Sequence, residues 1–453
     1  MSAARVNVSR QLLLAVFWFG ISFVWGALLA VTLPFLLVPE HPGPGNPSLV
    51  SAADKNTALS IIESGGLLVA ILIQPAAGAI SDHLRTRWGR RRPMIALGAL
   101  GAVAGVLLVA VSPAFLFLVA AYCLLQFFMN VAQGAYQGLL PDTVASHQRG
   151  QASGFLGIGT LAGQVAGAVA AGLIAPRAMC VVIAAVVAIT AAVTVIGVPE
   201  SADFTVAAER TNRVARSHPI IALRAYFSEF ARYPDFCWVV LSRFLMLTGL
   251  AGIQRFAANY IRDTYPGHYT LFGWDLGSAQ TATSVTFGII ILFGLLVTYP
   301  AVRLSDRVGR RRMLIAAGLC GAGGALLFFM ASSLSQVVTF AVLVAVCFGT
   351  FVSVDWAFMA DLAPRRRAGK FLGFSNLATA GAQAAAPAVL GPVIDVVNRG
   401  TSNTGGYRVL FLVAAFFFII GALVLSRTRA ERILDSDDDA ATRPATPVVR
   451  VGR

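Results

Sequence analysis

Charge is scarce in this chain: only 12% of its 453 residues are Asp, Glu, Lys or Arg, about half the share found in an ordinary soluble domain. Hydrophobic residues make up 57% of the chain, and the mean hydropathy is +0.74. This composition excludes an ordinary soluble globular protein, because a water-exposed surface needs far more charged side chains. It is typical of a polytopic membrane protein.

Residues that build disulfides, metal centres and enzyme active sites are also few. The five cysteines are scattered through apolar runs without paired spacing, and the five histidines all fall between those runs. These patterns indicate neither a disulfide framework nor a zinc site. The sequence has no phosphate-binding loop of the Gly-Lys-Ser/Thr type, which argues against an ATP-driven pump. We therefore expect no cofactor, no metal ion and no enzyme activity.

Basic residues outnumber acidic ones by 35 to 21, which gives a formal net charge of +14 and a pI of about 10.3. In a soluble protein this balance would suggest nucleic-acid binding. Here, however, 33 of the 35 basic residues are Arg, and they form short clusters between apolar runs. Such clusters are typical of the cytoplasmic loops of membrane proteins, so we expect a lipid bilayer and no nucleic acid as partner.

Long apolar runs account for most of the sequence. Runs of about 18 or more apolar residues are long enough to cross a bilayer as helices, and the alternating pattern of a membrane barrel is absent. We therefore predict an all-α polytopic membrane protein with twelve transmembrane helices. The predicted spans are 11–38, 57–80, 94–111, 114–140, 151–175, 178–198, 236–261, 278–300, 313–331, 336–360, 371–394 and 409–426.

Lys and Arg are distributed unevenly over the predicted loops. With the N-terminus placed inside, 28 of them fall on the inner side. The outer side receives only Lys55, Arg177, Arg262, Arg399 and Arg408. By the positive-inside rule we expect both termini to lie in the cytoplasm, and we expect the protein in the plasma membrane.

The chain also divides into two similar halves. The stretch 89–92 (GRRR) recurs at 309–312, and the pattern that begins at Asp142 recurs from Asp361. The predicted parts are an N-terminal six-helix bundle (1–198), a central loop (199–235), a C-terminal six-helix bundle (236–426) and a tail (427–453). Apolar residues at helical spacing in 219–234 predict an amphipathic helix along the inner membrane surface. We expect the Asp-rich tail to be a disordered cytoplasmic segment.

Each half places an Asp and several Arg in the short loop between its second and third helices. The stretches 78–93 (GAISDHLRTRWGRRRP) and 301–312 (AVRLSDRVGRRR) resemble the Gly-x-x-x-Asp-Arg-x-Gly-Arg-Arg loop of the major facilitator superfamily. Glycine permits a tight turn, and the Asp and Arg side chains can pair across helix ends in one conformation. We expect a cytoplasmic gate, paired only when that side is closed, from Asp82, Arg90, Arg91, Asp142, Asp306, Arg310, Arg311 and Asp361. The alternative is that the Arg clusters only set the topology.

The first half is also similar to the plant sucrose transporters and the animal proton-associated sugar transporters, and more distantly to the glycoside-pentoside-hexuronide permeases. The matching stretches are 86–93 (TRWGRRRP), 74–78 (QPAAG), 23–25 (FVW) and 130–132 (NVA). The resemblance implies the major facilitator fold, with a binding site between the two halves near the bilayer midplane, and a sugar substrate. Leu28 and Asn130 depart from the pattern, because the sugar transporters carry Gln or Glu at the first position and the sucrose transporters Asp at the second.

Amide side chains follow one face of the fourth predicted helix. They recur at i, i+4, i+7 and i+11 from Gln126 in an otherwise apolar span. Amides donate and accept hydrogen bonds at once, as sugar hydroxyls do, and an aromatic ring can cover the apolar face of a sugar. We predict a substrate site from Trp25, Gln126, Asn130, Gln133, Gln137, Asn376 and Gln383. The alternative is that the amides form hydrogen bonds between helices that hold the bundle together.

Four charged residues lie inside the predicted spans: Glu63, Arg243, Arg255 and Asp355. Because an ion in a bilayer is costly, each is expected to have a partner. In major facilitator proteins helices seven and ten line the cavity, and helices two and seven approach each other at the outer gate. The resemblance therefore implies Asp355 and Arg243 as a proton site with its counter-charge, and Glu63 with Arg255 as an outer latch. The alternative for each is a static buried pair.

These residues favour a proton-coupled symporter of a sugar or glycoside that works by alternating access. Its partners would be a small-molecule substrate, the coupling proton and the bilayer, and a monomer is compatible with this organisation. One alternative is an efflux antiporter of hydrophobic or cationic compounds, although the fifth predicted helix lacks the Gly-Pro pair typical of antiporters in this superfamily. A sensor or membrane enzyme would need a soluble domain or a polar catalytic cluster, and the sequence has neither.

Overall fold

The computed structural model describes residues 7–84, 86–144, 148–198, 230, 233–362, 368–401 and 404–428. Within these ranges it contains twelve helices that are long and apolar enough to cross a membrane. The predicted all-α, polytopic membrane architecture is confirmed. The tail from residue 429 onward, which was expected to be disordered, lies outside the described residues.

The helices follow one another in two sets of six spans. The first set contains α1 (Val8–Ala27), η1 (Leu28–Thr32), α2 (Leu33–Leu37), α3 (Lys55–His83), α4 (Arg92–Ala110), α5 (Phe115–Thr143), α6 (Arg149–Leu173) and α7 (Pro176–Gly197). The second contains α9 (Pro234–Thr264), α10 (Ala279–Val308), α11 (Arg310–Leu327), η3 (Phe328–Met330), α12 (Leu334–Leu362), α13 (Ala368–Gly400) and α14 (Gly405–Ser426). A short antiparallel hairpin of β1 (Thr270–Leu271) and β2 (Trp274–Asp275) links α9 to α10, with Leu271 opposite Trp274.

The first span is one helical rod with an irregular turn. Its α1 and α2 segments are joined by η1, a π-helical turn. The wider turn accommodates Pro34, which has no backbone N–H and whose ring would clash with the carbonyl group four residues earlier in a regular helix. Such π-helical turns often occur at functional sites. Leu29 and Ala30 of η1 line the cavity described below, whereas Leu28 is fully buried.

Glycines allow α1 and α6 to pack closely. A Cβ atom at Gly26 would lie 2.6 Å from the carbonyl oxygen of Gln164, and one at Gly167 would lie 2.9 Å from the backbone nitrogen of Ala27. Small residues at such crossings are usual between transmembrane helices, because they let the two backbones approach. The close packing holds α1 and α6 side by side at the centre of the molecule.

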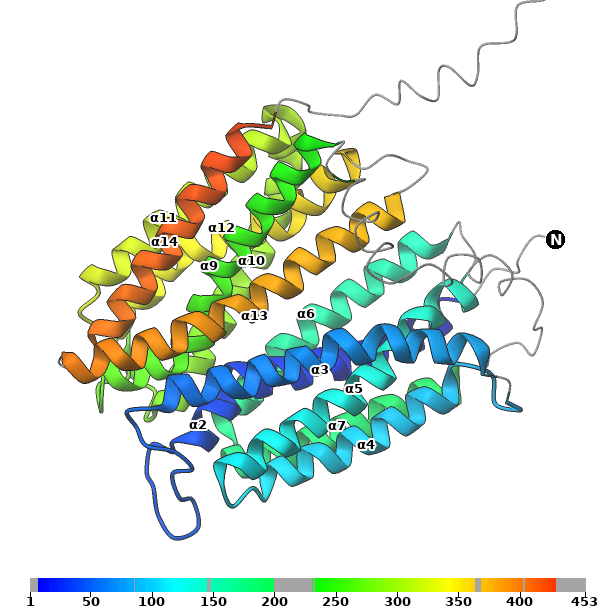
Figure 1. Ribbon diagram of the computed structural model, residues 1–453, viewed down its shortest axis with the longest axis horizontal. Coiled ribbons are helices and arrows are strands. Elements are labelled where there is room, and N and C mark those ends of the chain that lie inside the picture. The colour runs from blue at the N-terminus through cyan, green and yellow to red at the C-terminus, as the bar shows by residue number, and fades with distance from the viewer. Residues whose placement is uncertain are drawn as a thin grey trace, which may run out of the picture.

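The two halves meet at one end of the molecule and spread apart toward the other (Figure 1). The helices that touch between halves are mainly α3 with α13 and α6 with α10. We call the end with Lys55, Asp263 and Asp395 the closed end, and the end with Arg91 and Arg310 the Arg-rich end. Figure 1 shows α3 and α13 diverging toward the Arg-rich end.

Only a small part of the predicted amphipathic helix at 219–234 belongs to the described residues. Phe230 in this segment is 2% exposed, and its ring stacks on Phe374 of α13 with centroids 4.2 Å apart. Phe230 therefore packs against the C-terminal half rather than against lipid. The rest of the predicted helix, apart from Tyr233 and Pro234, lies outside the described residues.

Candidate functional site

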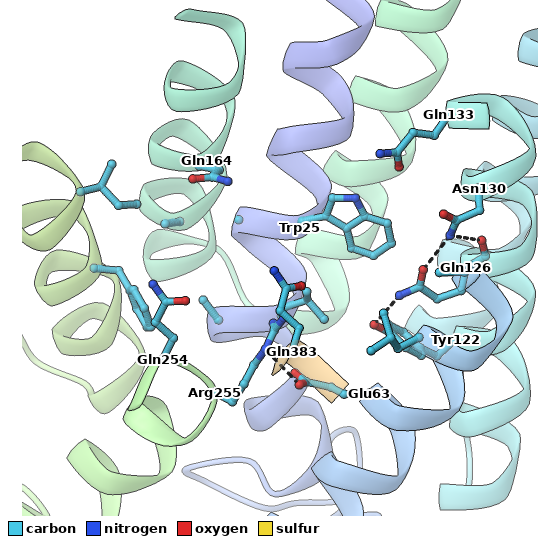
Figure 2. A pocket seen from close by; sticks show the side chains of 18 of the residues that line it. Trp25, Glu63, Tyr122, Gln126, Asn130, Gln133, Gln164, Gln254, Arg255 and Gln383 are labelled. Carbon is cyan, nitrogen blue, oxygen red and sulfur yellow. Dashed lines mark hydrogen bonds and ion pairs between the residues drawn. The ribbon is translucent and has the colours of Figure 1, made fainter. Parts of the chain in front are cut away.

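A cavity of about 420 Å³ lies between the two halves, and we call it the central cavity. Its walls come from α1, η1, α3, α5 and α6 of one half and from α9, α10, α12 and α13 of the other. Its volume is in the range of small-molecule sites. The polar and aromatic side chains that Figure 2 labels in its wall are Trp25, Glu63, Tyr122, Gln126, Asn130, Gln133, Gln164, Gln254, Arg255 and Gln383.

The amides of α5 form a chain of hydrogen bonds along their own helix. Gln126 Nε2 donates to the hydroxyl oxygen of Tyr122 at 2.8 Å, and Asn130 Nδ2 donates to the carbonyl oxygen of Gln126 at 2.8 Å and to its Oε1 at 3.0 Å. None of these bonds connects two helices. The chain instead fixes the orientation of Gln126 and Asn130 at the cavity wall, as Figure 2 shows.

Five of the seven residues predicted to bind substrate line the central cavity: Trp25, Gln126, Asn130, Gln133 and Gln383. Gln137 and Asn376 do not, and both are exposed. Gln137 is eleven residues beyond Gln126, roughly 16 Å along a helix at 1.5 Å per residue. It shares the helix face with the other amides but lies beyond the cavity toward the Arg-rich end. Their placement in the cavity was therefore wrong, while the binding role of the other five stays a prediction.

Four polar residues of the cavity wall were missed by the sequence reasoning: Gln74, Tyr122, Gln164 and Gln254. Gln74, Gln164 and Gln254 are single amides within their spans, and Tyr122 lies one turn before Gln126 on the face of the α5 amides. The signal that revealed the α5 row was repetition at helical spacing, and single amides on α3, α6 and α9 do not repeat. An amide inside a transmembrane helix is nevertheless a signal by itself, because it rarely faces lipid.

Glu63 and Arg255 form an ion pair in the cavity wall. Arg255 Nε lies 3.1 Å from Glu63 Oε2, so the pair joins α3 of one half to α9 of the other. Glu63 is only 6% exposed, and neither of its carboxylate oxygens has a hydrogen-bond partner within the described residues, so the contact with Arg255 is ionic. The predicted partners are thus in contact, whereas the latch role stays a prediction.

Arg243 and Asp355 also pair, but inside the C-terminal half. Arg243 Nη1 donates to Asp355 Oδ2 on α12, and its Nε donates to Thr379 Oγ1 on α13 at 2.9 Å. Its guanidinium lies over the ring of Trp356, 5.2 Å from the centroid. Asp355 is 1% exposed and Arg243 5%, and neither lines the central cavity. The proton role of Asp355 stays a prediction.

The closed end is held by a buried polar network that the sequence analysis did not anticipate. Lys55 Nζ on α3 lies 2.5 Å from Asp263 Oδ2 on α9, and the hydroxyl of Tyr407 donates to the same carboxylate oxygen at 2.6 Å. Asn259 of α9 donates to Asn56 Oδ1 at 2.7 Å. These side chains are all less than a tenth exposed, so the halves meet here through desolvated polar contacts.

Asp395 of α13 is the second acceptor in this network. It accepts from Asn56 Nδ2 at 2.8 Å and from the backbone N–H of Thr57 at 2.6 Å. Further from the centre, Arg262 donates to the carbonyl oxygen of Val38 at 2.5 Å, and Gln280 donates to that of Ile174 at 2.7 Å. Each of these bonds crosses from one half to the other.

At the Arg-rich end the predicted gate residues pair within the N-terminal half. Asp142 lies 2.6 Å from Arg90 Nη2 and 3.0 Å from Arg91 Nε, and Arg91 also contacts Asp82. Gly89 makes the tight turn with φ +100, a conformation that glycine adopts readily. Gly138 leaves room for Arg91, because a Cβ there would lie 2.7 Å from Arg91 Nε.

The C-terminal half repeats this arrangement in part. Arg310 Nη1 lies 2.6 Å from Asp361, and its Nη2 lies 3.9 Å from Asp306, whereas Arg311 donates to the carbonyl oxygen of Ser426. Both clusters are therefore paired while the halves spread apart at this end (Figure 1). Each of these pairs ties helices of one half together, so the predicted partners are in contact, whereas their role as a cytoplasmic gate stays a prediction.

Twelve membrane-spanning helices in two halves around a polar cavity define a polytopic membrane transporter. The chain matches the model of the Major Facilitator Superfamily over residues 12–387 and again over residues 266–452, and it belongs to that family.

The chain is also similar to known transporters in part of its sequence and to solved transporter structures in its fold. The General alpha-glucoside permease of Schizosaccharomyces pombe is 30% identical over 161 residues, 30% of this chain and 29% of that protein. The chain spans less than half the length of the curated relatives it matches. In fold it is similar to a bacterial homologue of the human lysosomal transporter Spinster (TM-score 0.73, 13% identity, 95% of this chain and all of that one). It is also similar to a D-xylose-proton symporter (TM-score 0.67, 14% identity, 94% and 99%).

Proposed function

We propose that this transporter carries a sugar or glycoside together with a proton by alternating access through the central cavity. The observation that carries the proposal is the wall of the cavity, where amides surround the ring of Trp25 (Figure 2). Amides match hydroxyl groups as both donors and acceptors, and an aromatic ring packs on the apolar face of a sugar. The partial match to an α-glucoside permease and the fold shared with a D-xylose-proton symporter agree with this substrate class.

The proposal places the Arg-rich end in the cytoplasm of a cell whose plasma membrane holds the protein, with both termini inside. The positive-inside rule supports this orientation. The closed end then faces the exterior, and the conformation described above opens toward the cytoplasm. Transport would require the closed-end network to part and the Arg-rich ends of the halves to come together.

Uptake into proteoliposomes tests the proposal. Purified protein is reconstituted, and accumulation of a panel of labelled mono- and disaccharides and glycosides is measured with and without an imposed inward proton gradient. We expect at least one compound to accumulate above its external concentration only when the gradient is present, and accumulation to collapse when a protonophore is added. Transport of none of the panel would contradict the proposed substrate class. Gradient-independent uptake would contradict proton coupling.

The second candidate is proton-coupled efflux of a hydrophobic or cationic compound. Phe287 and Ile290 of α10 and Phe348 of α12 form an apolar part of the cavity wall in the C-terminal half, whereas the α5 amides line it from the N-terminal half, which favours an amphipathic molecule. Efflux of lipophilic cations from preloaded proteoliposomes, driven by a proton gradient of the opposite direction, separates this candidate from sugar uptake.

A further inference from the structure

Two charged residues face the central cavity, and they come from opposite halves. Among the described residues in the cavity wall, Glu63 and Arg255 are the only ionisable pair of opposite charge. Glu63 lies on α3 and Arg255 on α9, and a single contact of 3.1 Å joins them. Figure 2 shows this contact at the side of the cavity away from Gln133. Any motion that separates the halves at the closed end must break it.

The contact with Arg255 stabilises the negative charge of Glu63. Arg255 is the positive group that faces it, α5 presents the neutral hydroxyl of Tyr122, and α13 presents the neutral amide of Gln383 (Figure 2). The carboxylate is almost fully buried, and neither of its oxygens has a hydrogen-bond partner in the described part of the chain. A buried carboxylate that loses its counter-charge is costly, and protonation removes that cost.

We propose that Glu63 carries the coupling proton and that its pairing with Arg255 expels this proton when the closed end shuts. The inference rests on the proposed function for the identity of the co-transported substrate, but not for the behaviour of the pair itself. It assigns the proton to a residue that shares the cavity with the amides and Trp25.

The movement of the two halves determines when Glu63 gains and when it loses its proton. When the closed end opens, Arg255 moves away with its half, and water from that side gives a proton to the Glu63 carboxylate, which becomes a neutral acid. When the closed end shuts, Arg255 returns, the O–H bond of Glu63 breaks, and the proton leaves to water on the Arg-rich side as the ion pair forms. One proton crosses per cycle, and no other reactant is needed.

Asp355 does not fit this role as well. It pairs with Arg243, and both residues belong to the C-terminal half, together with Thr379 and Trp356. A rocking motion of one half against the other moves this whole group as a unit. Its ionic contact therefore does not change between the two states, and a contact that is equal in both states cannot couple a proton to the motion between them.

The first test needs no sugar. A single cysteine at Leu29, in a background without the five native cysteines, is labelled by a membrane-impermeant maleimide added on the closed-end side. As the pH is raised from about 5 to about 8, we expect the labelling rate, corrected for the pH dependence of the reagent, to fall roughly fivefold because the Glu63–Arg255 pair favours the shut closed end. Glu63→Gln should label at the fast rate throughout. A Glu63→Gln variant with the pH dependence of the parent protein would overturn the proposal.

Asp54→Asn is the matched control. Asp54 also pairs with an Arg of the other half, Arg399, but this contact is exposed and lies outside the cavity. We expect Asp54→Asn to keep the pH dependence of labelling. Loss of the dependence in both variants would show that any cross-half ion pair produces it, which would also overturn the assignment to Glu63.

The second test uses a substrate from the uptake panel. We expect Glu63→Gln to retain measurable counterflow exchange while its gradient-driven accumulation falls to equilibration, because exchange does not require a proton to be released. Full accumulation by Glu63→Gln would refute the inference and leave the proposed function intact. If no sugar is transported, the proposed function fails, and the labelling experiment still decides the role of Glu63. Counterflow in the variant also shows that it is folded.

Discussion

Lys55 and Asp263 form a buried ion pair of 2.5 Å between the two halves, with side chains 5% and 7% exposed. The two partners differ in their other contacts. The Asp263 carboxylate also accepts a hydrogen bond from Tyr407 and lies 3.5 Å from Arg262, whereas the direct ionic partner of Lys55 is this carboxylate. Removing the carboxylate should therefore disturb the closed end more than removing the ammonium group.

The first prediction uses this asymmetry. Asp263→Asn leaves a buried ammonium without its counter-charge, which costs about 3–5 kcal/mol, so we expect the closed end to open and the cysteine at Leu29 to label at least tenfold faster from that side. Lys55→Gln should have a smaller effect, because Arg262 and Tyr407 still contact Asp263. The double variant should label more slowly than Asp263→Asn alone. Equal rates for the two single variants would contradict the asymmetry.

The second prediction concerns the close approach of α13 to α3 at Gly391. A Cβ atom there would lie 2.5 Å from the carbonyl oxygen of Asn56, and such overpacking typically costs about 1–3 kcal/mol. Gly391→Ala should therefore push α13 away from α3 and raise the labelling rate of the cysteine at Leu29 from the closed-end side roughly tenfold. Gly400→Ala on the same helix is the control, since nothing lies within 4 Å of its added Cβ. Equal labelling rates for Gly391→Ala and Gly400→Ala would contradict this prediction, because they would show that the close contact at Gly391 does not control opening of the closed end.

The sequence was sufficient for the twelve spans, and with the family resemblance it also indicated which intramembrane charges pair. Apolar runs of helical length mark each span. A charge inside such a run needs a partner of opposite charge, so Glu63 and Asp355 were each expected to pair with an intramembrane Arg. The spans follow from local apolar patterns, and the cost of burying one ion requires a partner for each charge, but which residue is the partner came from the helix arrangement that the family resemblance implies.

The closed-end network depends on contacts that no local pattern records. Asn56 and Asp395 are 339 residues apart, and Lys55 and Asp263 fall at the ends of spans, where polar side chains usually face water. Only the arrangement of α3, α9 and α13 makes these residues buried partners. The pairs at the Arg-rich end could be anticipated, in contrast, because each joins an Asp and an Arg of the same half that the repeated loop pattern already marks.

The third prediction tests the amide wall. Gln133 is half-buried and lines the cavity, and its side chain makes no hydrogen bond within the described part of the chain. Gln133→Leu should therefore leave expression unchanged while it raises the substrate Kd about two- to tenfold, the worth of one hydrogen bond. Asn130→Leu should weaken binding further, because it also releases Gln126. Gln137→Leu, outside the cavity wall, is the control, and normal affinity in the first two variants would contradict the cavity assignment.

The last prediction concerns Asp355, which the structure places in a pair inside one half. Asp355→Asn leaves the Arg243 guanidinium buried and without a counter-charge, so we expect a loss of stability of about 3–5 kcal/mol and a lower Tm of the purified protein. Counterflow and gradient-driven accumulation, each measured per folded molecule, should then change by the same factor. Arg243→Met combined with Asp355→Asn should recover part of the Tm, because no unpaired charge remains buried. A stable Asp355→Asn variant with normal counterflow but no accumulation would instead make Asp355 the proton site, since only a group that gains and loses a proton in each cycle separates those two activities.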